Sequence, residues 1–364
     1  MIDGPRDARD GIAPFFLAQG EQTGADVARR LASFIDGARR TLDIATYDFR
    51  LSDGLKAIVA AALAERAAAG VAIRIVYDAD KPSPPSLHAG MDPAPGGTGS
   101  FVQSLGLPWR RIGGLKLMHD KYLIRDAATP EARVWTGSTN LTDDAWTLQE
   151  NNVLELASPE LAAAYTHDFM EMWRSGTFEG TGAFDPGPVT LSYGGVSATV
   201  RLLFSPGRGP AINREVAERV RAARRRVWLC SMLLNSGALL SALLDLLQDG
   251  RVRVDGIYDR TQMEGVLVQW RQVPRNEWKI GAVRDIVDLA HLAGKDSTPY
   301  SPTSKHDFMH NKALVVDDTV VTGSFNFSHS AEQNAENILL IESAPLADAY
   351  SAYIDHLVTT YKEA

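Results

Sequence analysis

The chain has 364 residues, 45% of them hydrophobic and 23% charged, which is typical of a globular protein with room for two domains. Its net charge of −8 counts against broad electrostatic capture of nucleic acid, although a local basic cleft is compatible with an acidic total. The single cysteine, Cys230, excludes an internal disulfide, and its apolar neighbours favour a buried thiol.

The N-terminal residues 1–16 carry charges of both signs and no long apolar run, which predicts that they are not a signal peptide. The most apolar stretch, residues 57–72, is interrupted by Glu65 and Arg66, so it does not have the composition of a membrane span. We therefore expect a cytoplasmic protein without a transmembrane segment.

The first part of the chain is predicted to alternate helices and strands. A helix from Val27 ends near residues 38–40, and the alternating stretch TLDIATYDF predicts a strand. An Ala-rich helix over residues 53–69 stops at Gly70, and VAIRIVYD follows as a strand. Strands separated by helices favour a mainly parallel sheet with helices on its faces.

The same order recurs from Val216. A helix ends in AARRR, and the segments VWLCSML, residues 237–248 and VRVDGIYD then read as strand, helix and strand. Each half closes with a similar amphipathic helix, PELAAAYTHDFMEMW or PLADAYSAYIDHLV. The Arg clusters at the two helix ends, residues 39–40 and 224–226, are more typical of helix C-termini than of a nucleic-acid patch.

A Gly- and Pro-rich segment separates the two halves. We predict an N-terminal half over residues 1–176, a linker over 177–198 and a C-terminal half over 199–364, with VTLSY in the linker as a candidate edge strand. Long inserts, residues 80–114 and 260–307, precede the last part of each half, and the second is predicted to hold a helix over 283–292. Inserts of this length are either binding loops or plain surface excursions.

A polar pattern occurs twice. LMHDKYLIRD, WTGSTN and LQENNVLEL return as FMHNKALVVD, VTGSFN and QNAENILLI. The matched residues are His119, Lys121, Asp126, Gly137, Ser138, Asn140 and Glu150 in the first copy, and His310, Lys312, Asp317, Gly323, Ser324, Asn326 and Glu336 in the second. Two copies that agree in residue type and spacing indicate a duplicated functional unit.

These residue types suit phosphoryl chemistry. His and Lys two positions apart face the same side of a strand. Lys supplies a point charge for the nonbridging oxygens of a phosphodiester, and Asn and Ser supply neutral donors. An imidazole can attack phosphorus when neutral or protonate a leaving oxygen when charged. One copy holds a single proton-handling group, so two copies facing each other would supply a nucleophile and an acid together.

The pattern resembles the phospholipase D superfamily, whose members carry two His-x-Lys-x4-Asp motifs followed by Gly-Ser-x-Asn. The resemblance covers about residues 18–361. It implies an α/β fold of two duplicated α/β/α sandwich halves, related by a pseudo-twofold axis, with a single active-site cleft between them. It also implies a phosphodiesterase with a covalent phosphohistidine intermediate and with neither metal nor cofactor.

The resemblance implies a role for each motif residue. His119 and His310 would be the catalytic pair, with His119 favoured as the nucleophile, and Glu150 and Glu336 would orient their rings. The residues expected to hold the phosphate are Lys121, Lys312, Asn140, Asn326, Ser138 and Ser324. The residues expected to shape the turns are Asp126, Asp317, Gly137 and Gly323. His306 and His329 lie near the second motif. They are expected either to line the active-site cleft or to have a structural role.

The substrate is open at this point. The motif flanks GSTNLTDDAW and GSFNFSHSAE resemble the branch that contains small bacterial nucleases and mitochondrial cardiolipin hydrolase. We favour phospholipid hydrolysis or head-group transfer, with Met91, Leu107, Pro108 and Trp109 as an apolar rim for peripheral membrane contact. A metal-independent nuclease is the alternative function. The third option is an inactive binding protein, which the intact motifs disfavour. Head group, acceptor and oligomeric state stay open.

Overall fold

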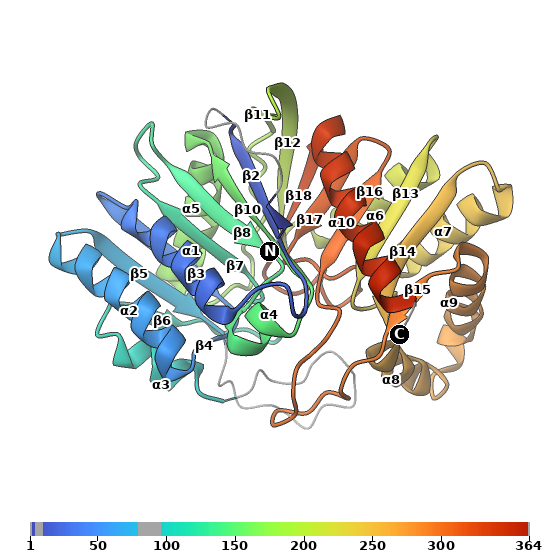
Figure 1. The fold of residues 1–364 in the computed structure, drawn as a ribbon, viewed down its shortest axis with the longest axis horizontal. Helices are drawn as coiled ribbons and strands as arrows, with labels where there is room; N and C mark the ends of the chain where they lie inside the picture. The colour runs from blue at the N-terminus through green and yellow to red at the C-terminus, as the bar shows by residue number, and fades with distance from the viewer. Residues whose placement is uncertain (1, 4–9, 79–95, 363–364) are drawn as a thin grey trace.

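The computed structural model describes residues 2–3, 10–78 and 96–362 (Figure 1). Residues 80–95 of the first insert, with His88 and Met91, lie outside the described residues. Within the described ranges the chain forms two eight-stranded sheets, one in each half, and a short two-stranded pairing of β4 (Phe49–Arg50) with β9 (Leu141–Thr142).

The two sheets have the same layout. From edge to edge, the first contains β1 (Ile2–Asp3), β2 (Ile12–Leu17), β10 (Asn151–Ala157), β8 (Arg133–Gly137), β7 (Lys121–Arg125), β3 (Thr41–Thr46), β5 (Ala72–Tyr77) and β6 (Trp109–Arg111). The second contains β11 (Pro188–Tyr193), β12 (Val196–Ser205), β18 (Glu336–Glu342), β17 (Thr319–Gly323), β16 (Lys312–Val316), β13 (Arg226–Ser231), β14 (Arg253–Asp259) and β15 (Ala293–Lys295). The matching order shows a duplicated α/β unit.

The prediction of a mainly parallel sheet is wrong. Within the two eight-stranded sheets of the described residues, the parallel pairs are β3–β5 and β5–β6 in the first and β13–β14 and β14–β15 in the second. The other neighbouring pairs are antiparallel, because hairpins and returning segments, rather than helical crossovers, join strands such as β7 and β8 or β16 and β17. Helix–strand alternation holds only for the first part of each half.

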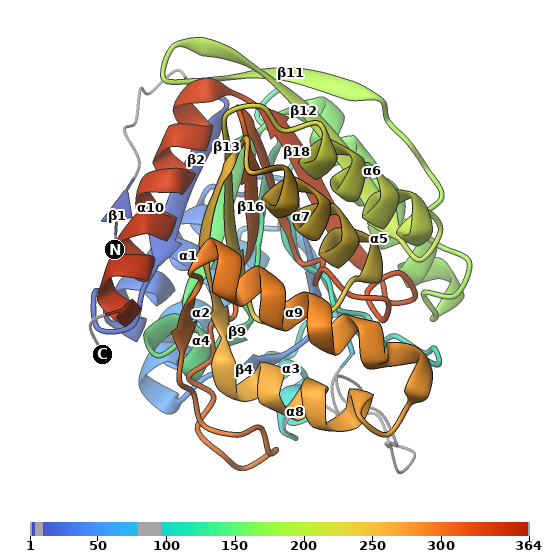
Figure 2. The same ribbon diagram turned by 90° about the vertical axis from the view of Figure 1, so that its right-hand side faces the viewer.

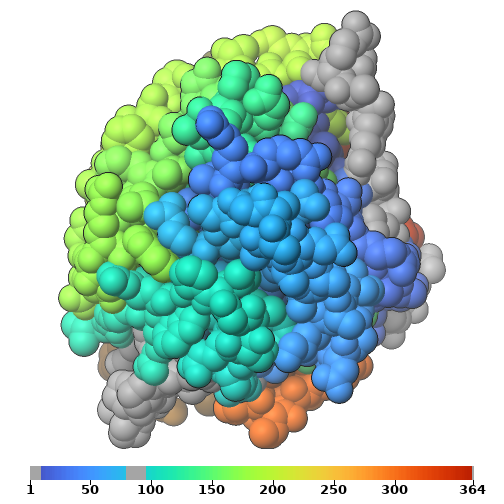
Figure 3. All heavy atoms as spheres, turned by 90° about the vertical axis from the view of Figure 1, so that its left-hand side faces the viewer, coloured from blue at the N-terminus to red at the C-terminus, as the bar shows by residue number. Residues whose placement is uncertain are grey.

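Helices cover both faces of each sheet. In the first half, α1 (Gly24–Asp36) and α2 (Asp53–Ala68) pack on one face, and α5 (Pro159–Ser175) on the other. In the second half, α6 (Gly209–Arg221), α7 (Gly237–Asp249) and α9 (Glu277–Ala290) pack on one face, and α10 (Ala344–Lys362) on the other. Figure 2 shows α10 to the left of the strands of the second sheet and α6 and α7 to their right, and Figure 3 shows the side of the molecule that α1 and α2 cover.

The halves share one core. The hydrophobic cluster between the sheets combines residues from both halves and includes α5 and α10. The rings of Phe16 and Tyr353 stack with centroids 4.5 Å apart, and those of Tyr165 and Phe204 meet edge to face at 5.3 Å. Because aromatic contacts of this kind bury large apolar areas, the two halves are held together as one body.

Local sequence explains the helix boundaries. Ser158 caps α5 by accepting a hydrogen bond from the backbone N–H of Leu161, and Gly176 ends the helix with φ of 76°. Ser236 and Gly250 bound α7 in the same way, with Gly250 at φ of 64°. These predicted helices therefore end close to their expected residues.

The segments between the repeated elements depart most from expectation. The second insert, predicted with one helix, contains α8 (Arg260–Trp270), a 3-10 turn (Pro274–Asn276) and α9. The first contributes α3 (Thr98–Ser104) and β6, and α4 (Asp143–Thr147) lies beyond β9. The segment VTLSY forms β11, which pairs with β12 at the edge of the second sheet. Among the helices of the described residues, none combines the length and apolarity needed to cross a membrane.

Candidate active site

Both repeated motifs begin at the starts of central strands. Lys121 is the first residue of β7 and Lys312 the first residue of β16, and each His lies two residues before its strand. Each motif is anchored by an Asp at the C-terminal end of a parallel strand, Asp78 directly after β5 and Asp259 as the last residue of β14. Asp78 accepts a hydrogen bond from the N–H of Met118 at 2.6 Å, and Asp259 accepts one from the N–H of Met309 at 2.9 Å. The residue before each His is therefore fixed to the end of a strand two places away in the sheet, β5 in the first half and β14 in the second.

The two motifs meet at the boundary between the halves. The backbone N–H of His119 donates to the carbonyl of Ala335 at 2.8 Å, and the N–H of Ala335 donates to the carbonyl of Leu117 at 2.8 Å. The tail of the second motif thus runs beside the His of the first. The electrostatics agree, because both Lys121 and Lys312 act on each of the two histidines.

His119 is held by a carboxylate from the other half. Its Nδ1 lies 2.8 Å from Oε2 of Glu336, which is fully buried. The other oxygen of Glu336 accepts a hydrogen bond from Nδ2 of Asn334 at 3.0 Å. This contact agrees with the predicted role of Glu336, although it crosses between the halves.

His310 is held by an amide instead of the predicted Glu150. Its Nδ1 lies 3.0 Å from Oδ1 of Asn151. Glu150 turns away and accepts a hydrogen bond from the buried Lys295 at 2.7 Å, and Tyr361 donates to its other oxygen at 2.5 Å. The prediction that Glu150 orients one of the two histidines is therefore wrong, and Asn151 takes that place.

The sheet register explains the correction. Gly137 pairs with Val153, whereas Gly323 pairs with Ile338, so the first copy has one more residue between its Gly and the paired strand. Counting from the Gly therefore matches Glu150 with Glu336, while counting from the strand matches Asn151 with Glu336. Pairing along the strand decides which side chain reaches the ring.

The motif lysines are buried beside the histidines. Nζ of Lys121 donates to the carbonyl of His119 at 2.6 Å, and Nζ of Lys312 donates to the carbonyl of His310 at 2.5 Å. Burial lowers the pKa of Lys121 to about 8 and lowers the pKa of Lys312 as well. An incoming phosphate anion would favour the charged form of both ammonium groups.

Both histidines are poised to be neutral. Burial first, and then the charges of Lys121 and Lys312, hold the pKa of each imidazole well below its usual value. Each residue is still 6% exposed. Neutral imidazoles beside two ammonium groups make a site that can both attack and position a phosphodiester.

The predicted phosphate-binding side chains divide into two groups. Asn140 and Asn326 are half-buried, and Oδ1 of Asn140 has no hydrogen-bond partner among the described residues. Ser138 and Ser324 are fully buried, and their hydroxyls accept the N–H groups of Asn152 and Asn337 at 3.0 Å. The Ser hydroxyls therefore brace the residues around them, and phosphate binding by Asn140 and Asn326 stays a prediction.

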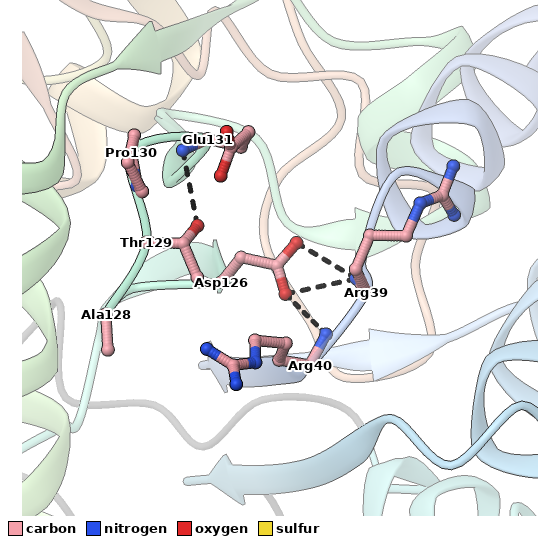
Figure 4. A pocket seen from close by; sticks show the side chains of 7 residues that line it. All are labelled: Arg39, Arg40, Asp126, Ala128, Thr129, Pro130 and Glu131. Atoms are coloured by element: carbon pink, nitrogen blue, oxygen red, sulfur yellow. Dashed lines mark hydrogen bonds between the residues drawn. The ribbon is translucent and has the colours of Figure 1, made fainter.

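The glycines and aspartates of the motifs shape turns. Gly137 has φ of 152° and Gly323 φ of 149°, and a Cβ on either would collide with the carbonyl oxygen of Asn152 or Asn337. Asp126 accepts the backbone N–H groups of residues 39–41 in a surface hollow (Figure 4), and Asp317 accepts those of residues 224–226. These contacts fit a structural place for both aspartates.

Sequence reasoning missed two neighbours of the motifs. The ring of Tyr47 lies edge-on to His119 at 4.8 Å, and Nζ of Lys121 lies 5.3 Å from its centre. Asp120, inside the first motif, is fully buried and accepts a hydrogen bond from Nδ2 of Asn337 at 3.3 Å. Its counterpart Asn311 contacts Asn152 at 2.6 Å in the other half.

Of the two further histidines, one lies close to the motifs. His306 is buried, stacks near Tyr300 and Phe308, and its charge disfavours the protonated form of His310. His329 is exposed and pairs with Glu332 on the surface.

Comparison with known proteins agrees with this architecture. A family model described as "Cardiolipin synthase, PLD-like domain" matches residues 31–173 and again residues 216–358. A phospholipase D from Rickettsia bellii (strain RML369-C) is 28% identical over 153 residues, which is 42% of this chain and 65% of that protein. A phospholipase D from Rickettsia prowazekii (strain Madrid E) is 25% identical over 155 residues, 42% of this chain and 64% of that protein. The chain therefore spans slightly less than two thirds of the length of these relatives.

A solved structure shares the whole fold. Phosphatidylserine synthase from Haemophilus influenzae Rd KW20 superposes with a TM-score of 0.64 at 13% identity, over 96% of this chain and 86% of that one. At this identity the likeness concerns the fold alone. The family model covers both copies of the motif and most of the chain, so the protein belongs to the phospholipase D superfamily.

Proposed function

We propose that this protein is a phosphodiesterase that works through a covalent phosphohistidine and acts on phospholipids. The observation that carries the proposal is the meeting of His119 and His310 at the boundary of the halves, each beside a buried lysine and each held through Nδ1. Holding Nδ1 leaves Nε2 of each ring as the nitrogen that exchanges with a substrate.

The reaction needs one neutral imidazole as the nucleophile and one protonated imidazole as the acid. Nε2 of one ring attacks phosphorus and forms a P–N bond, while the other ring gives its Nε2 proton to the leaving oxygen as the P–O bond breaks. Water or an alcohol then gives a proton to the second ring and attacks phosphorus, and the P–N bond breaks. Lys121 and Lys312, with Asn140 and Asn326, would stabilise the charge on the nonbridging oxygens.

Three observations support a phospholipid as the substrate. The curated relatives carry the name phospholipase D, and the net charge of −8 counts against nucleic acid. Trp109 and Leu115 in the first half are 41% and 88% exposed, which suits contact with a lipid surface. Leu107 is half-buried and Pro108 is exposed, so the described part of the predicted rim is only partly apolar at the surface.

The motif flanks favour a second candidate, a nuclease of the same superfamily. One experiment separates the two. Purified protein is given phosphatidylcholine or phosphatidylglycerol vesicles and, in parallel, single-stranded DNA, all in the presence of EDTA. We expect turnover of the vesicles to exceed that of DNA, with a transphosphatidylation product when an alcohol is added. Faster cleavage of DNA would overturn the phospholipid assignment.

The histidine variants test the chemistry itself. His119→Ala and His310→Ala should each abolish turnover on every substrate with an alkyl leaving group. His356→Ala, which changes an exposed histidine on α10, serves as the control and should keep full activity. Substantial activity in either motif variant, or a strict need for added metal, would defeat the mechanism.

A further inference from the structure

The supports of the two motif histidines occupy the same place in their halves but differ in charge. Glu336 holds His119 with a carboxylate, and Asn151 holds His310 with an amide, at 2.8 and 3.0 Å. Resting on the proposed phosphodiesterase function, with His119 as the nucleophile that the family resemblance implies, we propose that Asn151 is a positioning residue whose neutral hydrogen bond suits His310 to act as the proton donor.

The orientation of the Asn151 amide follows from its other contacts. Its Nδ2 donates to the carbonyl of Ala145 at 3.1 Å and to Oε1 of Gln149 at 3.3 Å. Its Oδ1 accepts from the hydroxyl of Ser138 at 2.8 Å. With Nδ2 engaged by two acceptors, the oxygen faces the ring of His310. Nδ1 of that ring therefore carries hydrogen, and Nε2 is left for proton exchange.

Charge changes in the reaction distinguish the two supports. When Nε2 of the nucleophile bonds to phosphorus while Nδ1 keeps its hydrogen, the ring becomes cationic, so a carboxylate beside it stabilises the transition state. The charge of the proton-donating ring changes in the opposite direction, because this ring begins as a cation and becomes neutral when it gives up its proton. A neutral partner stabilises its cation less than a carboxylate would, which makes the ring a stronger acid.

The surroundings reinforce this difference. The charges that act most strongly on His310 are those of Lys312, Lys121, His119 and His306, and each disfavours an added proton. His119 faces the same two lysines but has Glu336 at Nδ1. Burial raises the pKa of Glu336 to about 8, and the cation that forms on His119 in the reaction would favour the charged form of this carboxyl group. The second motif has Asn311 at the position of Asp120, so an amide replaces an acid there, as Asn151 replaces Glu336 at the ring. The binding of a phosphodiester anion would then favour the proton that His310 must deliver.

Leaving-group dependence tests the assignment. Phosphatidylcholine needs its choline oxygen protonated, whereas phosphatidyl-p-nitrophenol has a leaving group that departs without an acid. In single-turnover assays, we expect His119→Ala to lose both reactions. We expect His310→Ala to lose phosphatidylcholine cleavage by about 100-fold or more while p-nitrophenol release falls far less. The reverse pattern would overturn the role assignment.

Asn151 variants test its own part. Asn151→Ala should slow phosphatidylcholine cleavage about 10-fold and p-nitrophenol release less, because it removes one neutral hydrogen bond from the proton donor. Asn151→Asp keeps an acceptor but adds charge, so the alkaline limb of the pH–rate profile should move upward by about one pH unit or more. An equal loss on both substrates with no movement of either limb would show that Asn151 is only structural.

A measurement on the unmodified chain guards against misfolded variants. In histidine-¹⁵N-labelled protein, with signals assigned from His119→Ala and His310→Ala, neutral His310 should carry its proton on Nδ1. It should also take up a second proton at lower pH than His119. A proton on Nε2 of neutral His310, or the opposite titration order, would overturn the proposal. If the wild-type chain cleaves neither lipid, the proposed function fails instead, while the ¹⁵N result still decides the place of Asn151.

Discussion

Nδ1 of His119 lies 2.8 Å from Oε2 of Glu336, although the two residues are 217 positions apart in the chain. The first motif therefore depends on a side chain of the second. His310 depends in the same way on Asn151, 159 positions away. Each half supplies the side chain that holds the histidine of the other half, so neither half would form a complete site alone.

Replacing Glu336 with Gln should slow the attack of His119 on phosphorus. The amide keeps the shape but removes the charge that would stabilise a cationic ring, so turnover should fall about 10- to 100-fold, the range for a hydrogen bond to a charged group. The loss should be similar for phosphatidylcholine and phosphatidyl-p-nitrophenol. Glu342→Gln, at the exposed end of the same strand, is the matched control and should change turnover little. Unchanged turnover in Glu336→Gln would contradict the role of the carboxylate.

Asp120→Asn should stabilise the protein at alkaline pH. Burial, and then the charge of Glu336, raises the pKa of Asp120 from 3.8 to about 7. Because the folded state then holds a proton that the unfolded state releases, the contribution of Asp120 to stability is lost as pH rises from about 4 through 7. An amide fits this fold, as Asn311 shows at the matching position.

The comparison uses urea unfolding at two pH values. Relative to wild type, Asp120→Asn should raise the free energy of unfolding more at pH 8 than at pH 5. Asp245→Asn, which changes a surface carboxylate paired with Arg221, is the control and should show no such difference. A gain that is larger at pH 5 would mean that Asp120 is ionised in the folded protein.

Asp126→Asn should destabilise the fold while leaving chemistry nearly intact. Asp126 has φ of 55°, which Asn also tolerates, so the change isolates the charge that accepts three backbone N–H groups (Figure 4). We expect a loss of about 1–3 kcal/mol in thermal or urea unfolding. Glu131→Gln in the same hollow is the control. A large fall in turnover without a fall in stability would place Asp126 in the reaction.

Lys295→Met should leave the carboxylate of Glu150 buried without its cation. Both side chains are almost fully buried, and their ion pair joins β15 to the first half. Breaking such a pair costs about 3–5 kcal/mol, and the double variant Lys295→Met/Glu150→Gln should recover most of the loss in urea unfolding. Glu150→Gln alone should not move the alkaline limb that Asn151→Asp moves. A shift of that limb in Glu150→Gln would return Glu150 to the role first predicted for it.

Local patterns in the sequence were enough for much of this protein. The doubled His-x-Lys-x4-Asp pattern identified the family, and the amphipathic runs located the closing helices α5 and α10. These features depend on residue type and on spacings of a few residues along one strand or helix. The turns at Gly137 and Gly323 belong to the same class, because a Cβ is excluded at each by the adjacent strand.

Only the tertiary structure decided which side chains meet. Counting along the chain matched Glu150 with Glu336, but strand pairing at Val153 and Ile338 moved Asn151 into contact with His310. The mostly antiparallel sheets and the pairing of Glu150 with Lys295 also depend on segments far apart in sequence. Register and packing between distant strands are set by the whole core, and a local pattern carries no information about them.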